Sequence, residues 1–154
     1  MEVTTDENLQ DIVDTVVKNG ELTVSSSASY SGSIKVKAAI KSLSSYHGTG
    51  ATKGSLTSPN SDSLKVTIEG ASALQCSEGS VQKLVVKASG ASKFDGSMLN
   101  ASEVVANASG ASKIKVSVSE KLSAAASGAS KIEYSGSPIV EQSKSVTSAI
   151  RKTN

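Results

Sequence analysis

The sequence predicts an all-β fold, a right-handed parallel β-helix whose rungs of about 20 residues stack on one another. A short phrase, Gly-Ala followed by Ser or Thr, starts at glycines spaced 20, 20, 20 and 18 residues apart: Gly50, Gly70, Gly90, Gly110 and Gly128. Alternating apolar residues precede each of the last four glycines. Aromatic residues make up only 3% of the chain, which suits a narrow interior filled by Val, Ile, Leu and Ala. Crossover chirality predicts the right-handed coil.

Residues 1–32 are expected to form a cap and a linker. Asp6 at the start of a polar stretch predicts a short helical turn over residues 6–11. The pair Asn19-Gly20 lies between two runs of β-forming residues, and both central residues of a type I′ turn need a positive φ. We therefore expect an N-terminal hairpin around this pair, followed by a polar linker over residues 25–31.

Residues 33–150 are expected to form the stacked rungs, beginning with an alternating strand over residues 34–40. Each glycine marks a corner where the backbone needs a positive φ or a close approach. After each glycine, the alanine and the apolar residue three positions later, such as Ala111 and Ile114, are expected to point inward. This interval of three predicts a bend or bulge. The inward residues expected before the glycines are Leu64, Val66, Ile68, Leu84, Val86, Ala88, Val104, Ala106, Ala108, Leu122, Ala124 and Ala126.

The C-terminal end predicts a closed stack. Residues 145–150 read as a worn final copy of the repeat, and residues 151–154 as a polar tail. Solenoids need polar ends because an open stack of strands pairs with other chains. The whole chain, residues 1–154, is thus expected to be a single β-helical domain.

Composition and charge argue against several classes of function. The net charge is only +2, whereas nucleic-acid binding needs a concentrated basic surface, so no nucleic acid is expected as a partner. No membrane-spanning run of 18 apolar residues is present. No export signal opens the sequence, and we expect that a leader has been removed or the chain trimmed. Cys76 and His47 are single residues of their kind, so no disulfide, metal site or cofactor is expected. Cys76 shares the inward phase of Leu74 and is expected to be buried.

The lysines of the repeat are the candidate binding residues. Lys53, Lys93, Lys113 and Lys131 hold the same place in four rungs, and Lys115 lies in a second column two residues later that also holds Asp95 and Glu133. Two interpretations remain open. The columns form either a solvated and partly compensated face, or a surface that binds acidic glycans or lipid headgroups. The serines that follow each Gly-Ala are expected to form a hydrogen-bonded ladder with a structural role.

Catalysis is not expected. The β-helical enzymes that act on polysaccharides need clustered carboxylates and a basic residue beside the sugar. Here the acidic residues are scattered, and the single arginine, Arg151, lies near the C-terminus. A non-catalytic module that binds a partner along a long flat side, or serves as a scaffold, is the first hypothesis. The alternative is a glycan-binding or glycan-active protein, and self-assembly into a homo-oligomer through the strand edges stays open.

The chain resembles the bacterial family "putative auto-transporter adhesin, head GIN domain", found in Bacteroides-type cell envelopes. The resemblance rests on the entry at residues 6–9, the run at residues 17–24, the strand at residues 34–43, the tandem Gly-Ala-Ser-Lys phrases and the closing residues 134–138. Members usually carry Gly-Ala-Gly-Asp at the phrase, so corner geometry and charge are expected to differ here. The resemblance implies a β-helical fold, an exported, cell-surface location and an adhesin-like binding or scaffold role, and it brings no catalytic residues.

Overall fold

A computed structural model describes residues 2–4, 13–26, 35–37 and 42–153. The chain divides into two compact units, Met1–Lys41 and Ser42–Asn154, which we call the N-terminal unit and the solenoid unit. Each is described by itself. The predicted boundary between residues 32 and 33 lies outside the described residues, and the single domain over residues 1–154 stays a prediction.

In the N-terminal unit, β2 (Val13–Lys18) and β3 (Glu21–Ser26) form an antiparallel hairpin. The turn residues Asn19 and Gly20 have φ values of 52° and 78°, as a type I′ turn requires. The hairpin prediction is therefore confirmed, whereas its role as a cap stays a prediction. The helical turn expected over residues 6–11 lies outside the described residues.

The first alternating strand pairs differently from the prediction. β4 (Lys35–Lys37) is antiparallel to β1 (Glu2–Thr4), so it belongs to the N-terminal unit and not to the stacked rungs. Alternation identifies a strand with two different faces, but it does not say which strand is the partner.

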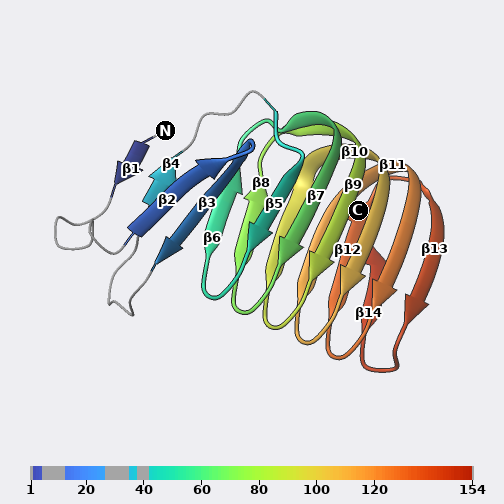
Figure 1. Cartoon of the computed structure of the whole chain (residues 1–154). Coiled ribbons are helices and arrows are strands. Elements are labelled where there is room, and N and C mark those ends of the chain that lie inside the picture. Colours follow the sequence, from blue (N-terminus) through green and yellow to red (C-terminus); the bar gives the residue numbers. More distant parts are fainter. Residues whose placement is uncertain (1, 5–12, 27–34, 38–41, 154) are drawn as a thin grey trace. The chain divides into compact units, whose positions relative to one another are not determined.

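The solenoid unit is built entirely from parallel pairs of strands among its described residues. Its coils stack into a β-solenoid of about five turns, and the long strands lie side by side in Figure 1. The strands are β5 (Ser45–Gly48), β6 (Lys53–Leu56), β7 (Asn60–Ile68), β8 (Ala73–Cys76), β9 (Gly79–Ala88), β10 (Lys93–Ala108), β11 (Lys113–Ala126), β12 (Lys131–Ser135), β13 (Ile139–Lys144) and β14 (Ala149–Lys152).

Each rung has three sides, which β10 shows most clearly because it runs continuously around the bends. Its buried residues alternate within three segments, at 94–96, 99–101 and 104–108, and the alternation slips by one residue between segments. We call these segments the first, second and third sides. Against β10, the next rung on β11 is three residues shorter at the first bend and one residue longer at the second. These two shifts account for the single 18-residue step between Gly110 and Gly128.

The core confirms the inward residues expected before the glycines, all of which are buried. After the glycines, the apolar residues expected to point inward are also buried: Leu74, Phe94, Ile114 and Ile132. The expectation for the alanines of the phrase is wrong. The alanines of the phrase are exposed, and the serines that follow them are buried: Ser72, Ser92, Ser112 and Ser130. At the corners, alanine amides form hydrogen bonds to the preceding rung. The amide of Ala111, for example, donates to the carbonyl oxygen of Gly90 at 2.8 Å. Alternation thus restarts at the serine, and no bulge is needed before Ile114.

The glycine corners have the predicted geometry. The five repeat glycines have φ values between 68° and 75°. A Cβ on Gly70, Gly90, Gly110 or Gly128 would lie 2.6–2.7 Å from the carbonyl oxygen of the glycine one rung earlier. Both reasons for glycine, a positive φ and a close backbone approach, therefore act at the same positions.

The last rung preserves the repeat without its glycine. Ser148 is buried where the earlier corner serines lie, and Ile150 pairs in register with Ile132. The worn copy is thus confirmed. The polar tail predicted at residues 151–154 is wrong at its start, because Arg151 and Lys152 continue β14 and pair with β12.

Candidate binding surface

The lysine column lies on the first side of the rungs, with its residues in register. Lys93 on β10 pairs with Lys113 on β11, which pairs with Lys131 on β12. Ala73 separates Lys93 from Lys53, so the column is interrupted once. The second column runs in parallel, from Ser55 through Gln75, Asp95, Lys115 and Glu133 to Arg151. We call the outward side chains of these two columns the basic face.

The basic face is far more positive than the chain as a whole. It holds six cations and two carboxylates, a net charge of +4, against +2 for the entire sequence. The positive charge of the molecule is therefore concentrated on one side of the rungs. The charged residues are Lys53, Lys93, Lys113, Lys115, Lys131, Arg151, Asp95 and Glu133.

Glu133 is the centre of an ion cluster on this face. Its register position points outward between two inward residues, yet it is only 5% exposed, because three cations cover it. The ammonium groups of Lys113 and Lys131 lie 2.8 and 3.0 Å from its carboxylate oxygens. The Nε of Arg151 donates to Oε1 at 3.0 Å, and its Nη2 donates to the same oxygen. The cluster joins three successive rungs.

The cluster holds Glu133 in its charged form. The hydrogen bond from Lys113, opposed by burial and supported by Arg151 and Lys131, lowers the pKa of Glu133 from 4.5 to about 2. Hydrogen bonds from charged donors to a carboxylate stabilise its ionised state. The carboxylate therefore stays negative over the whole physiological range of pH.

The other carboxylate of the face is less engaged. Asp95 lies 3.9 Å from the ammonium of Lys115 and accepts a hydrogen bond of 2.7 Å from the hydroxyl of Ser97. Its side chain is 23% exposed, against 6% for that of Glu133. Among the described residues, Lys53 and Lys93 are exposed and form no ion pair.

The predicted serine ladder forms, but its bonds go mainly to the backbone. The hydroxyls of Ser112, Ser130 and Ser148 donate to main-chain carbonyls of the preceding rung at 2.9–3.1 Å. The direct contact between side chains of the column is at its start, from Thr52 to Ser72 at 3.0 Å. These buried hydroxyls therefore join the rungs and are not available to a ligand.

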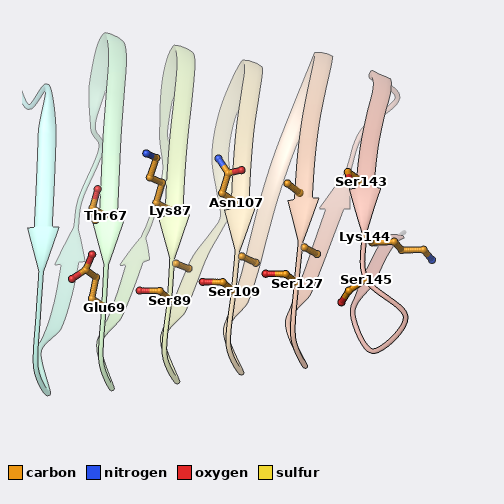
Figure 2. A pocket seen from close by; sticks show the side chains of 14 residues that line it. Thr67, Glu69, Lys87, Ser89, Asn107, Ser109, Ser127, Ser143, Lys144 and Ser145 are labelled. Carbon is orange, nitrogen blue, oxygen red and sulfur yellow. The ribbon is translucent and has the colours of Figure 1, made fainter.

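A separate groove runs across the third side of the rungs (Figure 2). It has a volume of about 680 Å³. Figure 2 shows Ser89, Ser109 and Ser127 in a row, one from each successive rung, with Lys87 and Asn107 beside them. We call it the serine groove. Its lining includes one carboxylate, that of Glu69, and hence not the pair that glycoside hydrolysis requires.

The remaining candidate residues lie apart from these surfaces. Cys76 is 1% exposed, as expected, and burial followed by the charge of Asp95 raises the pKa of its thiol to about 11. His47 is exposed on β5. In the part of the chain that the structure describes, no group of three metal-binding side chains gathers. The same residues include no helix long and apolar enough to cross a bilayer.

The sequence identifies the lysines of the basic face, but it does not reveal the ion cluster around Glu133 that contacts Lys113 and Lys131. The sequence places Arg151 in a polar tail and Glu133 in the second outward column, with no sign that the two residues meet. The signal was the second column itself, because Glu133 and Arg151 are 18 residues apart, the same as the last step between repeat glycines. Their contact follows once residues 149–152 are read as a further rung.

Comparison with known proteins gives a family and a fold. The sequence model of the family described as "putative auto-transporter adhesin, head GIN domain" matches residues 1–138. Among solved structures, a putative adhesin from Parabacteroides merdae matches with a TM-score of 0.55 and 15% identity, over 99% of this chain and 82% of that one. At this identity the likeness concerns the fold alone. The search of curated proteins gives no match.

Proposed function

We propose, because the chain belongs to the "putative auto-transporter adhesin, head GIN domain" family, that it is a non-catalytic, adhesin-like module that binds an acidic glycan along its basic face. The observation that carries this proposal is the concentration of a net charge of +4 on one side of a protein whose total charge is +2. We further propose that the protein acts outside the cell or at the cell envelope, in keeping with its family.

The geometry of the face suits a linear polyanion. Successive rungs of a parallel sheet are about 4.8 Å apart, so Lys93, Lys113 and Lys131 present regularly spaced charges. Uronate carboxylates and sulfate esters recur along acidic polysaccharides at spacings of the same order. Because most of these cations are partly exposed, binding is expected to weaken steeply as salt is added.

The test is calorimetric titration with dextran sulfate and polygalacturonate at low and high salt. Replacing Lys93 and Lys115 together by serine is expected to weaken binding roughly two- to thirtyfold, since each exposed charge contributes about 0.2–1 kcal/mol. The matched control replaces Lys65 and Lys83, which lie on the third side and outside the serine groove. An equal loss in both double variants would show that only net charge matters and that the basic face is not the site.

The serine groove supports a second candidate, a glycan-binding or glycan-active surface. Its serine hydroxyls and the amide of Asn107 are suited to hydrogen bonding with a neutral sugar chain. Its single carboxylate favours binding over hydrolysis. Incubation with neutral and acidic polysaccharides, followed by an assay for new reducing ends, separates the two roles. Release of reducing ends would contradict the non-catalytic proposal.

A scaffold role through self-association is tested separately. Sedimentation velocity over a range of protein concentrations reports whether the module forms a homo-oligomer. If it binds none of the polyanions but associates with itself, the scaffold role replaces the proposed glycan binding.

A further inference from the structure

The two carboxylates of the basic face differ in what they contact. Glu133 is nearly covered and accepts hydrogen bonds from Lys113, Lys131 and Arg151, which come from three different strands. Asp95 is more exposed, and its one ion pair is a long contact of 3.9 Å with Lys115. On a surface that binds anions, a carboxylate of either kind opposes the ligand by its charge. Glu133, however, also contacts three cations closely, whereas Asp95 has no such set of close contacts.

Glu133 fixes the positions of the cations that cover it. A free lysine side chain samples many rotamers. When a ligand orders that side chain, the lost conformational entropy weakens binding. In the protein without a ligand, the ammonium groups of Lys113 and Lys131 already contact the same carboxylate, and these contacts restrict the rotamers of both side chains. Each ammonium has three donors and uses one on Glu133. The side chains of Lys113 and Lys131 remain 36% and 33% exposed, so their other donors are accessible.

We propose that Glu133 is a positioning residue, which holds Lys113, Lys131 and Arg151 as a preformed cradle for one anionic group of the glycan, a sulfate ester or a uronate carboxylate. The cradle has a net charge of +2, from three cations and one carboxylate. This inference rests on the proposed function, because it assigns the central contact of that same face.

The test compares two variants that change charge equally. Glu133→Gln and Asp95→Asn each remove one negative charge from the basic face. Affinity for dextran sulfate is measured by calorimetry at one fixed salt concentration. We expect Asp95→Asn to strengthen binding about twofold through charge alone. We expect Glu133→Gln to weaken it roughly fivefold, although the face has become more positive, because the cradle loses its order.

A third variant keeps the net charge. Glu133→Asp shortens the side chain by one methylene group and draws the carboxylate away from the cations. A positioning role predicts that Glu133→Asp binds dextran sulfate more weakly than the wild-type protein. A role through charge alone predicts that the affinity does not change. Urea unfolding of each variant shows that the fold persists, and Glu133→Asp decides the question if Glu133→Gln does not fold.

The outcomes separate this inference from the proposed function. If wild-type protein binds dextran sulfate and both Glu133 variants bind as tightly or more tightly, the positioning role is overturned while glycan binding on the basic face stands. If wild-type protein binds neither dextran sulfate nor polygalacturonate, both fall together. Weaker binding by both Glu133 variants, with tighter binding by Asp95→Asn, establishes the cradle.

Discussion

At the scale of single residues, the corners depend on glycines that serve two purposes at once. Gly110 has a φ of 72°, and a Cβ there would lie 2.7 Å from the carbonyl oxygen of Gly90. Gly50 begins the stack with the same φ of 72°, but a Cβ there would meet nothing within 4 Å. The two positions therefore separate the cost of the backbone conformation from the cost of stacking.

Replacing Gly50 by alanine is expected to cost about 1–2 kcal/mol in free energy of unfolding, the ordinary cost of a left-handed conformation. Gly110→Ala is expected to cost about 2 kcal/mol more, because the added methyl group collides with a backbone that cannot move away. Urea unfolding of both variants measures the difference. Equal losses would mean that the stacked corner has room for a methyl group.

At the scale of the elements, alternation made the strands of the solenoid unit predictable. Leu84, Val86 and Ala88 on β9 all point inward, as their spacing requires. The Gly-Ala-Ser phrase could not be assigned in the same way, because all three residues are small and hydropathy does not show which of them faces the core. The buried serine is stabilised by a carbonyl of the neighbouring rung, a partner that appears only when the rungs are stacked.

The candidate site, like the strands, was predictable from the repeat only in part. The repeat placed Lys93, Lys113 and Lys131 in one column, and their register confirms it. The burial of Glu133 was out of reach, since it depends on Arg151, which lies beyond the clear repeats. A pattern read within one rung does not report contacts that join three rungs.

Ile114 tests the inward phase of β11. Its side chain is fully buried in the core. Ile114→Asp is expected to abolish cooperative unfolding, because an unpaired charge would enter an apolar stack at a cost of several kcal/mol. Ser127→Asp, at an exposed position at the corner that follows the same strand, is the control and is expected to stay within about 0.5 kcal/mol of the wild-type protein. Circular dichroism during thermal unfolding distinguishes them, and a stable Ile114→Asp protein would place this residue outside the core.

At the scale of the whole solenoid unit, each rung contacts chiefly its neighbours, so its ends are its weakest parts. The Glu133 cluster lies at the C-terminal end, where it links β11, β12 and β14. It therefore fastens the last rung to the body of the unit.

Acid is expected to loosen that end first. Because the folded state lowers the pKa of Glu133 from 4.5 to about 2, the unfolded state takes up a proton at a higher pH than the folded state does. The stabilisation is complete above about pH 5 and is lost as the pH falls towards 2. Wild-type protein should thus exceed Glu133→Gln in stability at neutral pH, and the two should converge near pH 2. A difference that persists unchanged in acid would contradict this account.

The stacked glycine corners also govern how such a molecule can change its length. Because each corner glycine rests directly on the one before it, whole rungs can be duplicated or deleted without altering the rungs on either side, provided that each copy brings its own glycine. The length of the solenoid unit would then change in steps of about 4.8 Å, one step for each rung. Related genes that differ by one repeat would encode solenoid units that differ in length by one such step.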